Sequence, residues 1–393
     1  MIEYNKEISQ LQPSRSIAFM AQAKQMKSKD PSIISLAGGE PDFDTPIKIT
    51  QEVKRQLDAG YTHYTVGPGL PELRNAIAQK LKEENHCNYT PEGVIVTPGG
   101  KFAIYMAVRS MVNPGDEVMY LEPGWVSYPS IIEASAAKPV PVRLTWDQNF
   151  CVSKEILDAH CSGKTKMLII NYPNNPTGRA LSMPEALEIK AFMEAHPDVL
   201  LLTDEIYERI LYTGKENISM ASFPEIADRV LTVNGFSKSV AMTGWRVGYV
   251  AASEKNAKVM YNLFQHTMTC VSGFIQKAAV TALSCREEIE QMRVEYEHRR
   301  DMFINGLNAI DGVDCMIPEG AFYAWVRFDI PGFDSEQICD YILKYARVVG
   351  VPGVAYGTEE PCVRFSFAAS REELETAVER IAAAMEGLRG ATE

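Results

Sequence analysis

The sequence lacks membrane-length apolar runs, paired cysteines and an excess of basic residues. No stretch of about 18 consecutive apolar residues occurs, and the charged first 29 residues lack the apolar core of a signal peptide, so we expect no membrane span or secretion signal. The net charge of -12 disfavours non-specific nucleic-acid binding, because phosphates would be repelled. The eight cysteines form no Cys-x-x-Cys pair and the six histidines show no metal-binding spacing. We therefore expect reduced thiols, no metal and a cytoplasmic location.

The length of 393 residues exceeds a typical single core, so we expect two domains. Short continuous apolar runs alternate with helical patterns, which is typical of a mainly parallel sheet buried on both faces. The runs are 94–96, 118–121, 167–170, 199–202, 230–233 and 247–250. They predict an α/β large domain with a doubly wound sheet over 48–290. A smaller α+β domain is predicted from 1–47 and 291–393, with helices expected over 14–28 and 286–307 and from Arg371.

The most informative pattern is Ser-Lys-x-x-x-Met-Thr-Gly-Trp-Arg, which begins at Ser237. It places Lys238 after a short apolar segment and Arg246 eight residues later. A lysine at that place can form a Schiff base with an aldehyde cofactor, and an arginine can hold the cofactor's phosphate. This pattern resembles the cofactor-lysine segment of class I pyridoxal phosphate (PLP) aminotransferases.

Other predicted strands are followed by residues that would complete a PLP site, since ligands of open α/β sheets lie beyond the carboxyl ends of the strands. Asp204 would pair with a protonated pyridine nitrogen, because a buried carboxylate needs a partner. Asn175 and Tyr207 can donate to a phenolic oxygen. Gly100 begins a helix whose N–H groups suit a phosphate, although glycine turns before helices are common. Trp125 could stack on the ring or occupy the core.

Nearly the whole chain resembles the fold type I PLP-dependent aminotransferases, in particular their bacterial aspartate aminotransferase-like subgroup. Beyond the cofactor segments, the resemblance rests on residues 37–46, 64–74 and 363–367. It implies that Arg364 clamps the substrate α-carboxylate with the backbone of Gly39 nearby, and that Trp125 and Asn175 also line the substrate pocket. It further implies a homodimer with shared active sites, in which Tyr64 reaches the phosphate across the interface.

One position departs from the family pattern. Some relatives carry a serine three residues before the lysine as a phosphate ligand, whereas this chain has Gly235 there. Ser237 is the candidate substitute. The implied reaction is ping-pong: Lys238 links to the cofactor, is displaced by an incoming amine and then moves the α-carbon proton. A 2-oxo acid is released, and a second one, such as 2-oxoglutarate, accepts the amino group.

The substrate side chain depends on Lys101, in the first turn of the phosphate-binding helix. In the resembling subgroup a lysine there reads a distal carboxylate, which favours aspartate first, then glutamate or prephenate. The alternative is an exposed lysine at a helix start. Arg15 could add a second cationic contact, or could be packed or solvent-facing. Aromatic amino acids and kynurenine remain alternative donors.

Two other functions share the cofactor. A C–S β-lyase would use the same carbanion but release ammonia and pyruvate, and Lys101 disfavours it. A PLP-sensing regulator would carry an added DNA-binding module, for which the sequence shows no basic helix-turn-helix. A nucleotide-binding loop at Gly163-Lys164-Thr165 is excluded, because the required glycine five residues earlier is Asp158.

Overall fold

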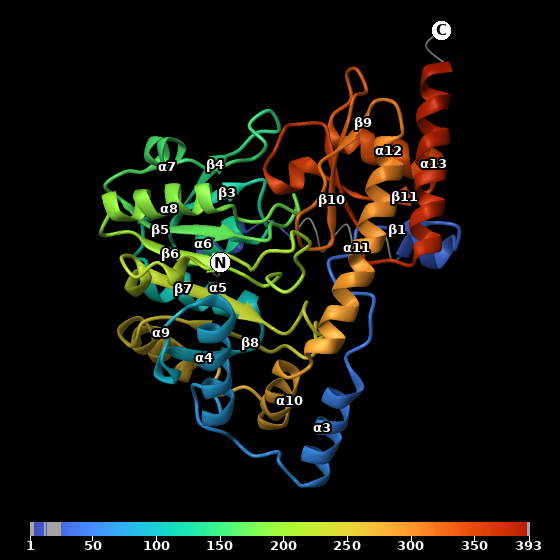
Figure 1. Cartoon of the computed structure of the whole chain (residues 1–393). Coiled ribbons are helices and arrows are strands. Elements are labelled where there is room, and N and C mark those ends of the chain that lie inside the picture. The colour runs from blue at the N-terminus through green and yellow to red at the C-terminus, as the bar shows by residue number, and fades with distance from the viewer. Residues whose placement is uncertain (1–3, 12, 14–24, 391–393) are drawn as a thin grey trace.

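The computed structural model describes residues 4–11, 13 and 25–390 (Figure 1). Its largest element is a seven-stranded sheet with the order β2-β8-β7-β6-β5-β3-β4. The strands are β2 Val94–Thr97, β3 Glu117–Glu122, β4 Lys138–Arg143, β5 Thr165–Asn171, β6 Leu200–Asp204, β7 Val230–Gly235 and β8 Gly248–Ala251. All neighbouring strands are parallel except β8, which runs antiparallel to β2 and β7. The prediction of a mainly parallel sheet is confirmed.

The sheet is buried on both faces, which explains the continuous apolar runs. Along β5, Leu168 and Ile170 belong to the core on one face, whereas Met167 and Ile169 belong to the core on the other. The helices around the sheet are α3 Ile47–Asp58, α4 Pro71–Asn85, α5 Gly100–Met111, α6 Tyr128–Ala134, α7 Lys154–His160, α8 Met183–Ala195, α9 Glu254–Thr267 and α10 Gly273–Leu283. Buried residues of α5, α6 and α9 join one core, and those of α4, α7, α8 and α10 join the other. This arrangement is the doubly wound fold.

Strand β4 was absent from the sequence prediction. Its sequence, Lys-Pro-Val-Pro-Val-Arg, contains Pro139 and Pro141, which interrupt an apolar run and cannot donate backbone hydrogen bonds. Such a strand is tolerated at a sheet edge, where one side needs no donors. The structure places β4 at the edge, paired in parallel with β3 alone.

The remaining elements form a second layered unit (Figure 1). An antiparallel sheet has the order β12-β13-β10-β9, and β1 pairs in parallel with β11. The elements are β1 Ile34–Ser35, α11 Arg286–Asn308, β9 Val313–Cys315, β10 Tyr323–Phe328, α12 Ser335–Ala346, β11 Val348–Val349, β12 Val351–Pro352, the 3-10 helix η4 Gly353–Tyr356, β13 Cys362–Ser366 and α13 Arg371–Gly390. The short helix α1 Lys6–Gln10 instead lies against α6 of the large unit. The large α/β and smaller α+β architectures therefore both match the prediction. The proposed domain boundaries stay predictions.

Three sequence expectations can be compared directly with the described residues. Residues 25–29 are helical at the end of the helix predicted over 14–28, whose residues 14–24 lie outside the described part of the chain. All eight cysteines are free. No helix in the described ranges has the length and apolar character needed to cross a membrane.

A buried carboxylate lies directly behind the carboxyl end of β6. Glu205 is 1 % exposed, and its Oε2 accepts hydrogen bonds from Asn217 Nδ2 at 3.3 Å and from the Ser219 hydroxyl. Thr203 Oγ1 donates to its Oε1 at 3.2 Å. Burial, followed by the nearby negative charge of Glu208, raises the pKa of Glu205 from 4.5 to about 8. Glu205 is therefore protonated at neutral pH.

The substitution Glu205→Gln should remove a pH dependence of stability. The pKa of Glu205 is higher in the folded than in the unfolded protein. The stability that protonated Glu205 contributes to the wild-type protein is therefore fully present below pH 4.5 and is lost as pH rises towards about 8. The loss should approach about 1.4 kcal/mol per pH unit in that window. Glutamine mimics the protonated acid, so the free energy of unfolding of the variant should rise relative to that of wild type between pH 5 and 8. Urea unfolding at pH 5, 6.5 and 8 tests this. A difference in the free energy of unfolding between variant and wild type that stays the same at all three pH values would contradict the raised pKa of Glu205.

Candidate active site

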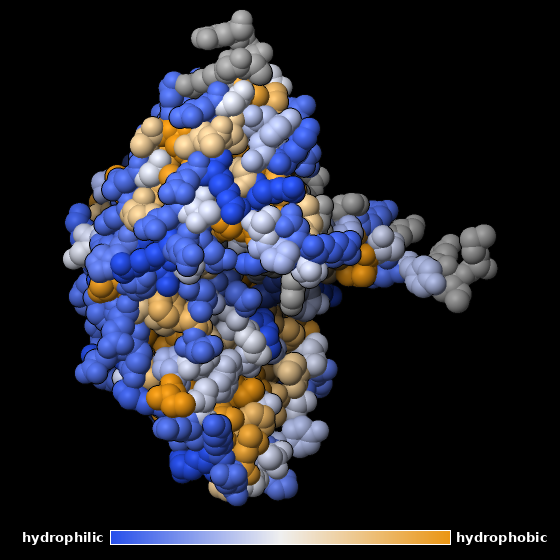
Figure 2. All heavy atoms as spheres, turned by 90° about the vertical axis from the view of Figure 1, so that its right-hand side faces the viewer, coloured by the Kyte–Doolittle hydropathy of each residue, from blue (hydrophilic) through white to orange (hydrophobic). Residues whose placement is uncertain are grey.

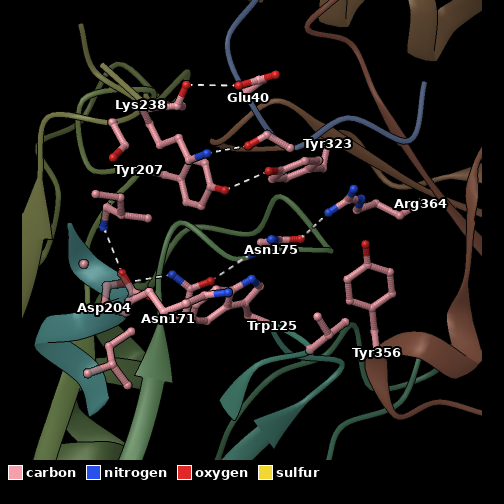
Figure 3. A pocket seen from close by; sticks show the side chains of 18 of the residues that line it. Glu40, Trp125, Asn171, Asn175, Asp204, Tyr207, Lys238, Tyr323, Tyr356 and Arg364 are labelled. Carbon is pink, nitrogen blue, oxygen red and sulfur yellow. Dashed lines mark hydrogen bonds between the residues drawn. The ribbon is translucent and has the colours of Figure 1, made fainter. Parts of the chain in front are cut away.

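A cavity of about 400 Å³ lies beyond the carboxyl ends of β5, β6 and β7, between the large sheet and the smaller unit (Figure 3). It is lined by every predicted site residue that the structure describes, except Tyr64. These lining residues are Gly39, Gly100, Lys101, Trp125, Asn175, Asp204, Tyr207, Ser237, Lys238, Arg246 and Arg364. The strand-end residues therefore converge, as expected for an open α/β sheet.

Lys238 follows β7 and lines the cavity, with its side chain partly buried. Its Nζ donates a hydrogen bond to the backbone oxygen of Gly39, which belongs to the N-terminal segment (Figure 3). Burial above all, together with the positive charges of Arg364 and Arg246, lowers the pKa of Lys238 from 10.5 to about 8, against the opposing effects of Glu40 and Asp204. A substantial fraction of the amine is therefore neutral near pH 8, which is the form that can act as a nucleophile or base.

Asp204 ends β6 and points one carboxylate edge into the cavity. Tyr128 Oη donates to its Oδ2 at 2.9 Å, and the Ile206 backbone N–H donates to its Oδ1 at 3.3 Å. Burial nevertheless raises the pKa of Asp204 to about 6, against the effect of these hydrogen bonds and of Lys238. Because burial disfavours the charged carboxylate, a cation in the cavity would stabilise it.

A third region of the cavity is built around the start of α5. Gly99 has a positive φ of 86°, which glycine adopts readily, and α5 begins at the next residue. A Cβ at Gly99 would lie 2.7 Å from Nη2 of Arg246, so the turn holds the guanidinium close to the helix N-terminus. Arg246 Nη1 also donates to the Thr243 oxygen at 2.8 Å. Backbone N–H groups beside a cation form a site suited to a phosphate.

Arg364 reaches the cavity from β13 of the smaller sheet. Its Nη1 donates to Asn175 Oδ1 at 3.0 Å, and its Nη2 donates to the Ala37 oxygen at 2.8 Å (Figure 3). The guanidinium carbon lies 4.4 Å from the ring centroid of Tyr323. The arginine is therefore held rigidly between three segments, with its charge available to a carboxylate in the cavity.

Two further predicted residues lie together at the wall formed by α5 and the turn after β3. Lys101 Nζ lies 4.9 Å from the centroid of the Trp125 ring. Burial, and secondarily Arg246, lowers the pKa of Lys101. Lys101 is exposed to solvent but is partly desolvated where it lines the cavity, so it is an exposed helix-start lysine that also faces the site. Trp125 packs edge-on against Tyr128 while keeping one face to the cavity.

Of the predicted residues that the structure describes, Tyr64 alone does not line the cavity. Tyr64 lies in the loop between α3 and α4 and is 88 % exposed. Its predicted contact with a phosphate would require a second chain, so it stays a prediction. Arg15 lies outside the described residues, and its predicted substrate contact also stays a prediction.

The sequence reasoning missed several residues of the site. Tyr323 Oη hydrogen-bonds Tyr207 Oη at 2.8 Å, and Tyr128 holds Asp204. Glu40 lines the cavity and accepts from the Thr243 hydroxyl at 3.0 Å. Tyr323 lies in an apolar run that is typical of a protein core, so the sequence pattern did not distinguish it from a core residue. Glu40 lies inside the quoted segment 37–46 and could have been singled out there.

Comparison with known proteins shows the family to which the chain belongs. The family described as "Aminotransferase class I and II" matches residues 31–381. The chain therefore belongs to the class I and II aminotransferases and is a transaminase of fold type I.

Particular relatives are similar over nearly the whole chain. A "Bifunctional aspartate aminotransferase and glutamate/aspartate-prephenate aminotransferase" of Petunia hybrida is 37 % identical, covering 98 % of this chain and 83 % of the relative. The aspartate aminotransferase of Bacillus subtilis (strain 168) is 38 % identical, covering 96 % of this chain and 97 % of the relative. The crystal structure of the aspartate aminotransferase from Rhizobium meliloti superposes with a TM-score of 0.94 at 36 % identity, covering 98 % of this chain and 99 % of that chain.

Proposed function

We propose that this transaminase uses PLP to move the amino group of L-aspartate to a 2-oxo acid such as 2-oxoglutarate. The observation that carries the proposal is the meeting of Lys238, Asp204 and Arg364 in one cavity. An amine, a buried carboxylate and a rigid guanidinium are the three groups that amino transfer with this cofactor needs. The names of the relatives support aspartate as the donor.

The cavity residues fit PLP. The buried carboxylate of Asp204 requires a cation, and the turn at Gly99 with Arg246 forms a cradle for a phosphate. We assign Asp204 to the ring nitrogen, Asn175 and Tyr207 to the phenolic oxygen, and Trp125 to the ring face. The backbone N–H groups of Gly100 and Lys101, with the side chains of Ser237 and Arg246, are assigned to the phosphate end. When bound, PLP supplies an aldehyde for a lysine amine and a cationic ring that accepts the electron pair of the substrate α-carbon.

The protein's own residues then perform binding and proton transfer. Arg364 binds the substrate α-carboxylate bidentately, and Asn175 keeps the guanidinium oriented. Lys238 Nζ, once it is neutral, takes the proton from the substrate α-carbon. The pKa of about 8 leaves Lys238 neutral often enough to serve as this base near neutral pH.

Lys101 is proposed to read the distal carboxylate of the donor. The substitution Lys101→Gln should lower kcat/KM for L-aspartate about ten- to a hundredfold, the cost of a lost hydrogen bond to a charged group. L-Phenylalanine carries no distal carboxylate, so its kcat/KM should change little. The exposed Lys82, changed to Gln, is the matched control. An equal loss with both donors would show that Lys101 serves the cofactor or the α-carboxylate instead.

A donor panel tests the proposed function as a whole. The PLP-loaded protein is assayed with L-aspartate, L-glutamate, L-phenylalanine and L-kynurenine, each paired with a 2-oxo acid that is not its own product. The fastest transfer is expected from L-aspartate to 2-oxoglutarate. Transfer only from aromatic donors would keep the reaction and overturn the aspartate assignment. Ammonia and pyruvate from cystathionine, without transfer from any donor, would establish the lyase.

We further propose a homodimer in which Tyr64 completes the partner's phosphate site. Exposed apolar side chains lie on α3 and in the loop that follows it, namely Ile47, Leu57, Tyr64 and Val66. Figure 2 shows apolar side chains in the lower part of that view, where Figure 1 places α3 and α10. A surface of this kind favours association.

The mass of the protein in solution, measured by light scattering, tests the homodimer. Tyr64→Phe should keep the dimer and weaken PLP binding, because only the hydroxyl is removed. A fully active monomer would contradict both statements.

A further inference from the structure

Tyr356 is a cavity residue whose hydroxyl has no evident structural use. It is the last residue of η4, is 2 % exposed and lines the cavity opposite Lys238 (Figure 3). Its Oη is buried and has no hydrogen-bond partner within the described part of the chain. A buried hydroxyl without a partner costs free energy, and phenylalanine would fill the same space without that cost.

The ring of Tyr356 is held in place by its surroundings. Trp325 packs against it at right angles, with ring centroids 5.6 Å apart. The Gly124 N–H donates to the Tyr356 backbone oxygen at 3.2 Å, and the Val354 N–H donates to Ser335 Oγ at 3.1 Å. These contacts determine where the hydroxyl points, so its unpaired state is not a consequence of a loose side chain.

The hydroxyl lies beside the arginine already assigned to the substrate. The guanidinium carbon of Arg364 is 5.2 Å from the centroid of the Tyr356 ring. Nε of Arg364 is also buried without a partner within the described part of the chain. Burial raises the pKa of Tyr356, so its hydroxyl stays protonated and remains a donor. Two unpaired donors at one end of the cavity match the two oxygens of a carboxylate.

We propose that the Tyr356 hydroxyl donates a hydrogen bond to the substrate α-carboxylate next to Arg364. This inference rests on the proposed function and adds a substrate-binding residue to it. Because every amino donor and every 2-oxo acid carries this carboxylate, Tyr356 acts on all substrates alike, in contrast to Lys101, which is specific to a distal carboxylate.

The test compares binding of succinate and propionate to the PLP-loaded wild-type, Tyr356→Phe and Lys101→Gln proteins. Propionate lacks one of the two carboxylates of succinate, and binding is read from the cofactor's absorption. Tyr356→Phe should weaken both ligands about tenfold, the effect of one hydrogen bond to a charged acceptor. Lys101→Gln should weaken succinate alone. The exposed Tyr345, changed to Phe, is the control and should change neither.

Two results would overturn the proposal. A Tyr356→Phe protein that loses affinity for succinate alone would place the hydroxyl at the distal carboxylate. Unchanged affinity for both ligands would leave it without a role in substrate binding. Wild-type transfer from L-aspartate is measured on the same preparation, so a failure of the proposed function is seen separately as absent transfer.

Thermal unfolding of the ligand-free proteins provides a readout independent of binding. Removing an unpaired hydroxyl should leave the unfolding temperature of Tyr356→Phe equal to or above that of wild type. A lower unfolding temperature than in the Tyr345→Phe control would show that the hydroxyl has a partner inside the protein, which would also overturn the proposal.

Discussion

Replacing Lys238 with alanine is expected to lower the transamination rate by about 10⁴-fold or more, since general-base catalysis alone accounts for factors up to that size. The change removes the amine that links to the aldehyde and also removes the base for the α-carbon proton. The position of Lys238 in the cavity wall and its pKa of about 8 are suited to both tasks. Initial rates with L-aspartate and 2-oxoglutarate measure the loss.

Two further variants distinguish the loss of the positive charge of Lys238 from the loss of its reactive amine. Lys238→Arg keeps a cation in the cavity but cannot form the link, so it should be as impaired as the alanine variant. The exposed Lys255 of α9, changed to Ala, should remain fully active. A Lys238→Ala protein that retains a tenth of the wild-type rate would remove this lysine from the mechanism.

The second large effect is expected from Asp204→Asn, which should lower kcat by about 10²- to 10³-fold, the range for loss of a preorganised electrostatic contact. Asparagine keeps the size of the side chain and loses the negative charge that would stabilise the cationic ring. The exposed Asp198, changed to Asn, is the control and should have no effect. A kcat within twofold of wild type would contradict the pairing.

Asp204 also predicts a pH dependence of PLP binding. In the unloaded protein the pKa of Asp204 is about 6, so the carboxylate is ionised above that pH and protonated below it. PLP affinity should therefore fall more steeply with decreasing pH through about 6 in wild type than in Asp204→Asn, in which protonation of Lys238 still opposes binding. Titration of the unloaded proteins with PLP at pH 5, 6 and 7.5 measures it, and equal slopes in both proteins would refute the assignment.

The sheet and most of the cavity lining could be predicted because both follow from local patterns. Buried parallel strands require continuous apolar runs, and their carboxyl ends meet at one edge. Polar residues within a few positions of the ends of such runs, as Asp204 and Lys238 are, are therefore brought to one edge of the sheet. The convergence of these residues is confirmed by the structure, whereas their chemical roles stay proposals.

Other features depended on contacts that no local pattern contains. Strand β4 is broken by prolines and exists because it pairs with β3 at an edge. Tyr128, Tyr323 and Tyr356 have the appearance of core aromatics in the sequence, and only tertiary packing directs their hydroxyls to Asp204, to Tyr207 or into the cavity. Tyr64 could be assigned only through the family resemblance, because its expected contact lies on another chain.

The measurement that tests the central claim most directly is the half-reaction of the PLP-loaded protein with L-aspartate in the absence of any 2-oxo acid. We predict complete conversion of the cofactor's absorption from its aldehyde form to its amine form, release of one oxaloacetate per site, and full reversal on adding 2-oxoglutarate. Release of ammonia, or an absorption spectrum that no amino acid changes, would contradict the account.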